Sequence, residues 1–233
     1  MVGFEGFPSG GLQFLDELSR NNNKPWFDAH RAEFDEYLMA PARDLVVDLG
    51  VQLQERVSPR INVEPRVNGS IMRMNRDVRF SRDKTAYKTW LGLWFWEGKG
   101  RSMDCAGCYF GLSAHELTLG AGKHGFDPAM LGRYRSAVVD PAMGAELVAA
   151  LEGIRQAGPY EIGGQHYKQV PPGFDRGHER AALLLHNALY AHATLPIPEE
   201  LHTSAFVGFC LGHYAALAPL HNWLARLTEG TPE

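Results

Sequence analysis

The sequence predicts an α+β fold, in which a central, mostly antiparallel sheet of short strands is flanked by N-terminal and C-terminal helices. Apolar residues recur at helical spacing up to about residue 58 and again after residue 128. Between these regions, aromatic and β-branched residues alternate with glycines, which is typical of short strands. Because helical and strand patterns do not alternate along the chain, a parallel βαβ architecture is not indicated. We therefore expect one domain over residues 1–233.

Two helical segments are expected before the sheet. Ser9 is a suitable N-cap for the first helix, and the asparagines at 21–23 predict a turn because they tolerate left-handed backbone. Pro25 suits the first turn of the second helix, where its missing N–H has no partner to lose. Pro41 predicts a bend or restart before the helical spacing continues to Ser58. The expected apolar faces consist of Phe14, Leu15, Leu18, Phe27, Phe34, Tyr37 and Leu38.

Short strands are expected in the middle third. They cover Val67 and Ile71, residues 91–96, residues 108–112 and residues 117–119. Strand alternation would place Trp94 and Trp96 on one face and Phe95 on the other. Residues 120–123 are interpreted as a hairpin turn, since they lack the spacing of a phosphate-binding loop. A highly charged connection occupies residues 75–88.

Helices return in the last third. They are expected after Pro128, over residues 144–155 and over residues 206–227, where apolar residues follow three- and four-residue steps. A stretch rich in glycine and proline, residues 158–177, interrupts them, and the apolar stretch 181–190 is counted with the helices.

Composition excludes several classes of protein. With 45% hydrophobic residues and a net charge of −4, the chain can form a large core and has no overall attraction for nucleic acid or acidic membranes. Any anion site must therefore be local. The N-terminus lacks a signal-peptide pattern, no apolar run approaches the length of a membrane span, and three cysteines make no disulfide framework. We expect a cytoplasmic protein with no membrane partner.

The most distinctive segment is residues 73–88, which contains six basic and two acidic side chains and so has a charge of +4. Its arginines recur every third residue, at 73, 76, 79 and 82. On an extended or turning backbone, several guanidinium groups could converge, and each offers two parallel N–H donors to a phosphate or carboxylate. The alternative is a solvated loop braced by arginine–aspartate pairs.

The candidate site follows from this segment. Asp77 and Asp83 could orient neighbouring arginines, and they are the catalytic acid–base candidates if chemistry occurs there. Lys24 and Trp26, at the start of the second helix, could add a charge and a stacking face. The expected ligand-binding residues are Arg73, Arg76, Arg79, Ser81, Lys84, Tyr87, Lys88, Lys24 and Trp26.

Neither a metal site nor a cofactor is predicted. The pair Cys105 and Cys108 stands alone, without the second pair of ligands that a structural zinc requires. The ten histidines are scattered and form no metal-binding motif. Cys210 lies on the apolar face of the last predicted helix and is expected in the core.

Several of these motifs together resemble a bacterial family catalogued as domain of unknown function 2461. The resemblance rests on Asn21–Phe27, on Arg76–Lys84 followed by Tyr87-Lys88, and on Pro172–Asp175. Pro25 and Ala86 depart from the pattern, and neither departure removes a charged group. The likeness covers nearly the whole chain and implies the fold and its extent, but it implies no activity.

The function expected from the residues is binding of, or action on, an anionic small molecule that bears a phosphate or carboxylate. One alternative is a module that binds nucleic acid or an acidic protein segment, in which Trp90, Trp94 and Trp96 could stack on bases. A further alternative is a scaffold whose charged loop only shapes the fold.

Overall fold

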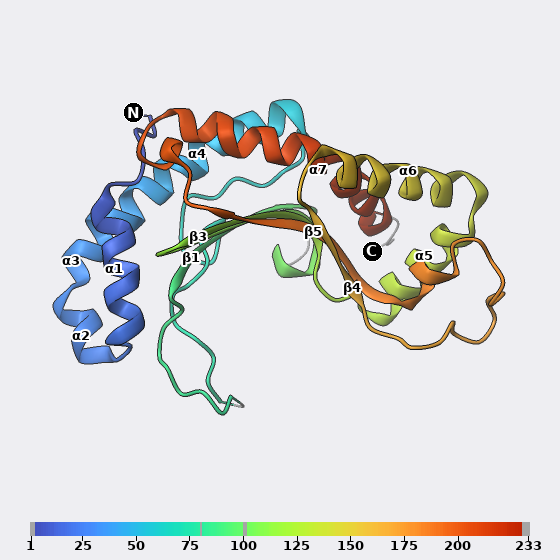
Figure 1. Cartoon of the computed structure of the whole chain (residues 1–233), viewed down its shortest axis with the longest axis horizontal. Coiled ribbons are helices and arrows are strands. Elements are labelled where there is room, and N and C mark those ends of the chain that lie inside the picture. The colour runs from blue at the N-terminus through green and yellow to red at the C-terminus, as the bar shows by residue number, and fades with distance from the viewer. Residues whose placement is uncertain (1–2, 80, 100–101, 230–233) are drawn as a thin grey trace.

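A computed structural model describes residues 3–79, 81–99 and 102–229, and shows a five-stranded antiparallel sheet with long helices on one face (Figure 1). The strands follow the order β1-β2-β3-β5-β4. They are β1 (Trp90–Glu97), β2 (Ala106–Ser113), β3 (Glu116–Lys123), β4 (Glu161–Gln165) and β5 (His186–Pro196). The α-helices are α1 (Ser9–Arg20), α2 (Lys24–Ala29), α3 (Arg31–Phe34), α4 (Ala40–Arg56), α5 (Pro128–Val139), α6 (Pro141–Ala157) and α7 (Ala205–Glu229). The predicted α+β class is confirmed.

The N-terminal helices follow the local sequence signals closely. Helix α1 begins at Ser9, but its N-cap is Pro8 and no side chain caps it, so the capping role expected for Ser9 is wrong. Asn23 caps α2 by accepting a hydrogen bond from the Trp26 N–H at 3.0 Å, and a proline lies in its first turn. A π-helical turn over Asp35–Met39 precedes α4, so the predicted restart near Pro41 is confirmed.

The two faces of β1 contribute to different apolar clusters. Leu91, Leu93 and Phe95 belong to the main core beneath the helices, whereas Trp94 and Trp96 form a second cluster with Cys105. The predicted alternation is therefore confirmed. The strand expected around Val67 and Ile71 is wrong, because these residues form only isolated bridges.

Two further expectations are wrong in the C-terminal half of the sheet. Residues 120–123 are not a turn but the end of β3, where Gly120 pairs with His192. The stretch 181–190 is not helical throughout, because a short 3₁₀ helix gives way at His186 to β5, which lies between β3 and β4. Its strand conformation depends on backbone pairing with β3, about seventy residues earlier in the chain, which a local pattern does not reveal.

Helix α7 covers the sheet and completes the core. Cys210, Tyr214 and Trp223 are fully buried on it, as the three- and four-residue spacing predicts. One hydrophobic cluster extends from Phe4 to Leu227. In the described part of the chain, no helix combines the length and apolar character that a bilayer span requires.

Candidate functional site

Residues 75–79 and 81–87 form the two sides of a hairpin, here called the arm, which projects from the sheet on the side away from α4 and α7 (Figure 1). Asn75 and Tyr87 form an antiparallel bridge at its base. The Arg76 N–H donates to the Ala86 carbonyl at 2.9 Å, and the Lys88 N–H to the Met74 carbonyl at 2.8 Å. The charged connection predicted from the sequence is therefore a two-stranded ribbon near its base.

The base of the arm is fixed to the N-terminal helices through Tyr87. Asn22 donates through its side-chain amide to the Tyr87 carbonyl at 3.0 Å and accepts from the Tyr87 N–H at 2.9 Å. The Tyr87 ring is buried and stacks on Phe27, with centroids 4.2 Å apart. Tyr87 thus anchors the arm, and its place among the ligand-binding candidates stays a prediction.

Towards the tip of the arm, two arginines are paired with the two aspartates. Arg79 binds Asp77 in a bidentate manner, with Nε–Oδ1 at 2.9 Å and Nη2–Oδ2 at 2.7 Å. Arg76 donates through Nη1 to Asp83 and to the Thr85 hydroxyl. These contacts agree both with the orienting arrangement and with the loop braced by arginine–aspartate pairs that the sequence suggested, and they neutralise two of the positive charges internally.

The pairing also determines the protonation state of the aspartates. The Thr85 N–H, followed by Arg76, lowers the pKa of Asp83 to about 2, and Arg79 lowers the pKa of Asp77. Both are therefore ionised at neutral pH, whereas an efficient acid–base group has a pKa near the working pH. The contacts favour an orienting role, and catalysis by Asp77 or Asp83 stays a prediction.

Other predicted site residues form hydrogen bonds or ion pairs with separate partners and do not gather around one point. Lys84 donates to the Val78 carbonyl at 2.9 Å, and Ser81, half-buried, donates its N–H to the same carbonyl at 3.3 Å. On α2, Lys24 forms an ion pair with Asp28, which raises the pKa of the lysine.

Trp26 packs beside Phe14 and stacks on His30, with ring centroids 4.1 Å apart in the stack. Its ring is thus engaged within the N-terminal helices, and a role for it in ligand binding stays a prediction. The structure does not bring all the predicted ligand-binding residues to one point.

The arm root, defined here as Arg73, Lys88, Trp90 and Tyr109, has a different character. Burial and the nearby charge of Arg73 lower the pKa of Lys88, whose Nζ lies 5.9 Å from the centre of the Trp90 ring. Burial raises the pKa of Tyr109, and a side-chain hydrogen bond with Trp90 opposes this rise. Trp90 is 37% exposed, so part of its ring is open to solvent.

Arg73 and Lys88 are neighbouring cations, and Arg73 also makes a small contribution to the lowered pKa of Asp77. Among the described residues, no carboxylate lies within ion-pair distance of either one. Lys88 is half-buried and Arg73 is exposed, and their like charges repel each other. The described part of the root therefore carries an excess of positive charge.

Sequence reasoning missed Tyr109 as a member of this group. From the sequence, Trp90 is expected near Lys88 as a stacking surface. Tyr109 is distant in the sequence and reaches Trp90 because β1 and β2 pair. The buried Trp94 and Trp96 are unavailable for stacking, which corrects that part of the nucleic-acid alternative.

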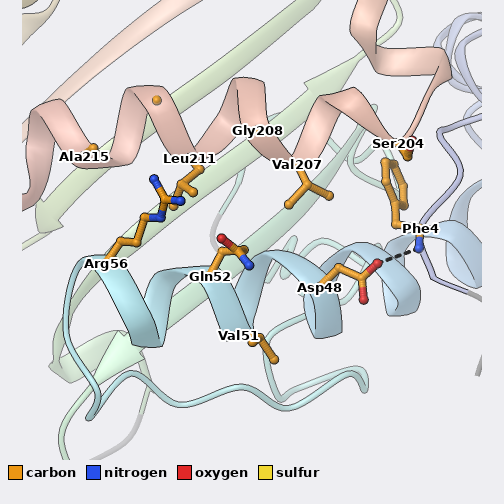
Figure 2. A pocket seen from close by; sticks show the side chains of 11 residues that line it. Phe4, Asp48, Val51, Gln52, Arg56, Ser204, Val207, Gly208, Leu211 and Ala215 are labelled. Atoms are coloured by element: carbon orange, nitrogen blue, oxygen red, sulfur yellow. Dashed lines mark hydrogen bonds between the residues drawn. The ribbon is translucent and has the colours of Figure 1, made fainter.

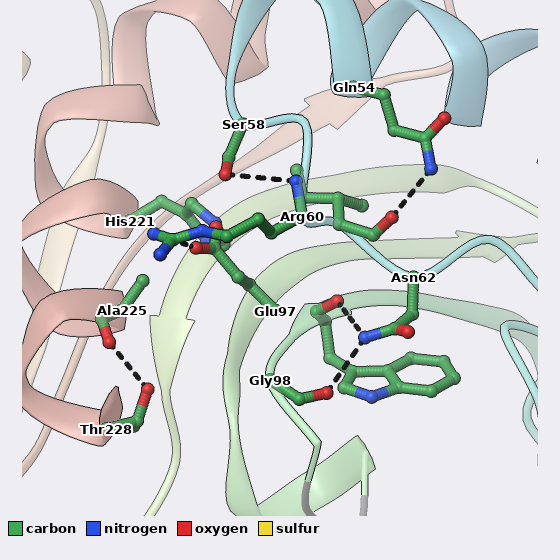
Figure 3. A network of polar contacts seen from close by, with 11 residues as sticks. Gln54, Ser58, Arg60, Asn62, Glu97, Gly98, His221, Ala225 and Thr228 are labelled. Carbon is green, nitrogen blue, oxygen red and sulfur yellow. Dashed lines mark hydrogen bonds and ion pairs between the residues drawn. The ribbon is translucent and has the colours of Figure 1, made fainter. Parts of the chain in front are cut away.

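A second polar cluster, centred on Glu97, lies at the other end of β1 (Figure 3). Glu97 is 2% exposed; its Oε2 lies 3.0 Å from Nε2 of the fully buried His221, and its Oε1 lies 2.5 Å from Nη2 of Arg60. Burial alone would raise the pKa of Glu97, but hydrogen bonds from His221 and Ser58 and the charges of His221 and Arg60 lower it to about 2. The cluster joins β1 to α7 and to the segment after α4, which is a structural role.

Comparison with known proteins gives one match. A family model described as conserved hypothetical protein (DUF2461) matches residues 11–223. Searches of curated proteins and of solved structures gave no match.

Proposed function

The chain belongs to the DUF2461 family of conserved hypothetical proteins, and we propose that it binds a small molecule bearing a phosphate or carboxylate group at the arm root. The resemblance seen in the sequence is thereby confirmed. The family description names no activity, so the proposal rests on the residues of the site alone.

The observation behind the proposal is the unneutralised pair of Arg73 and Lys88. The two aspartates of the arm form their ion pairs with Arg76 and Arg79, and Arg73 makes only the smallest contribution to the lowered pKa of Asp77, so the root keeps an excess of positive charge. Arg73 can offer two parallel donors to one oxyanion, and Lys88 adds a compact charge from its half-buried position.

The neighbouring aromatic groups suit an organic anion better than an inorganic one. The exposed part of Trp90 offers an apolar surface for the body of a ligand, while the cations hold its charged end. Each charge-assisted hydrogen bond contributes about 1.5–3 kcal/mol. Loss of one cation is therefore expected to weaken binding by roughly tenfold to a hundredfold.

The test compares the root with the tip of the arm. Thermal shift with nucleotides, sugar phosphates, dicarboxylates and inorganic phosphate would identify a ligand, and calorimetric titration would give its affinity for wild type, Arg73→Ala, Lys88→Met and Arg79→Ala. We expect the two root variants to lose affinity and Arg79→Ala to retain it, because Arg79 is already paired with Asp77.

Two results would contradict the proposal. If no anion stabilises wild type, the root is not an anion site. If Arg79→Ala weakens binding as much as Arg73→Ala, the ligand also contacts the tip of the arm. The Arg79–Asp77 ion pair would then not keep Arg79 from binding the ligand.

A second candidate is a module that binds single-stranded nucleic acid, favoured by the exposed Trp90 beside two cations on a projecting arm. Binding of this kind would weaken steeply with added salt, because phosphate contacts release counterions. Fluorescence anisotropy with labelled oligonucleotides from low to physiological salt checks this. Absence of binding at low salt excludes it.

A further inference from the structure

A surface groove of about 670 Å³ runs between α4 and α7, away from the arm (Figure 2). Phe4 and Leu211 contribute apolar surface to it. Gly208 and Gly212 lie on its α7 side, and a Cβ atom added to either would meet no atom within 4 Å. The α7 side of the groove therefore has open space next to Gly208 and Gly212.

An exposed apolar side chain projects from α4 on the side away from α7 (Figure 2). Val51, on the α4 side of the groove, is 46% exposed, which is unusual for a β-branched apolar residue in this protein. Burial of the exposed part of this side chain is favourable, so both the valine and the open space beside the glycines favour a partner surface. The surface thus presents an exposed apolar side chain on α4 and open space beside the glycines of α7.

Charged groups stand at opposite ends of the groove. Asp48 lies near the end formed by Ser204 and Arg56 lies towards the other end, with Gln52 between them (Figure 2). The two residues are eight positions apart on α4, which is about 12 Å along the helix axis. Asp48 accepts a hydrogen bond from the Phe4 N–H at 2.7 Å, and Arg56 has no hydrogen-bond or ion-pair partner in the described part of the chain.

This charge pattern is complementary to itself under a two-fold rotation. Gln52 lies midway between Asp48 and Arg56 on α4. A two-fold axis that passes near Gln52 makes the two copies of α4 antiparallel. Asp48 of each copy then lies opposite Arg56 of the other copy. The same rotation places Val51 of each copy against the open space beside the glycines of the other. Interfaces of two-fold dimers have this reciprocal form.

We infer that the groove is the interface of a homodimer of this chain, with two reciprocal Asp48–Arg56 pairs and two Val51 side chains seated against Gly208 and Gly212. The inference does not depend on the proposed anion site, which lies on the opposite side of the sheet. It commits to a second copy of this chain as the occupant of the groove.

Charge reversal tests the reciprocal pairing directly. Arg56→Glu and Asp48→Lys should each be monomeric in sedimentation velocity under conditions where wild type is a dimer, because each variant opposes like charges twice. An equal mixture of the two variants should recover the dimer, since both contacts then join opposite charges. Arg155→Glu is the matched control, because this exposed residue of α6 does not line the groove, and it should remain dimeric.

Clear outcomes overturn the inference. A wild type that is monomeric at every concentration up to its solubility limit would do so, as would a mixture that stays monomeric although both variants are folded by circular dichroism. Asp48→Lys loses the hydrogen bond from the Phe4 N–H. If this variant does not fold, Val51→Glu is used instead to test for the dimer. This change affects an exposed side chain, so the monomer should fold, and persistence of the dimer would overturn the inference.

Discussion

Replacement of Glu97 by glutamine is the perturbation whose effect the structure specifies best. The substitution keeps the size of the side chain but removes the charge that His221 and Arg60 surround (Figure 3). Because Glu97 is only 2% exposed, water cannot replace the lost interactions. A buried ion pair that loses one partner is strongly destabilised, since the remaining charge has no compensation.

The magnitude follows from the pKa of the carboxyl group. Its pKa falls from an ordinary value of 4.5 to about 2 in the folded protein. At about 1.4 kcal/mol per pKa unit, the ionised carboxylate contributes about 3 kcal/mol to the free energy of unfolding at neutral pH. The folded-state pKa is the lower one, so this contribution is complete above pH 4.5 and is lost as the pH falls through about 2.

The assay is urea denaturation of wild type and Glu97→Gln at several pH values. At pH 7 we expect the variant to be less stable by about 3 kcal/mol, and at pH 3 by only about 1 kcal/mol, since part of the contribution is already lost in wild type. Glu152→Gln, an exposed change on α6, is the control and should leave stability nearly unchanged. A difference between wild type and Glu97→Gln that is the same at both pH values would refute the reasoning, because the loss would then not come from the charge.

Three further predictions concern the arm and the buried thiols. Asn22→Ala removes two hydrogen bonds to Tyr87, so it should lower the free energy of unfolding by about 1–2 kcal/mol and speed hydrogen exchange in the arm; unchanged exchange would contradict this anchor. Affinity for an anion at the arm root should fall as the pH rises through the lowered pKa of Lys88, because the lysine loses its charge below the ordinary value of 10.5, and binding titrations at increasing pH check this. Burial raises the pKa of Cys108 to about 12 and raises that of Cys210, so both thiols should resist a disulfide reagent in the folded protein and react after unfolding; rapid labelling of the native protein would show that they are accessible.

Local patterns predicted the elements whose structure depends on local interactions. Helix α7 follows from its apolar spacing, and α2 follows from Asn23 and Pro25, because capping and helical periodicity act within a few residues. Strand β1 follows from its alternating apolar and aromatic residues. Strand β5 does not, because its identity depends on pairing with the distant β3 and β4.

The site shows the same division. The composition of residues 73–88 identified the basic segment and suggested that Asp77 and Asp83 orient arginines. It did not show which of the cations form ion pairs. The arginines at 73, 76, 79 and 82 are evenly spaced, so the sequence gives no reason to distinguish Arg73 from Arg76. Among the described residues, Arg73 has no ion-pair partner within bonding distance, whereas Arg76 is bonded to Asp83.

By itself, the sequence determined the α+β class, the family, most of the helices and the position of a positively charged segment in an acidic protein. These properties depend on residue type and on spacing over a few turns or one strand. The tertiary structure decided that Tyr109 joins the arm root, that Glu97 meets His221, and that Asp48 and Arg56 flank one groove. Each of these outcomes depends on segments that are distant in the chain, which strand pairing and the packing of α7 on the sheet and on α4 bring together.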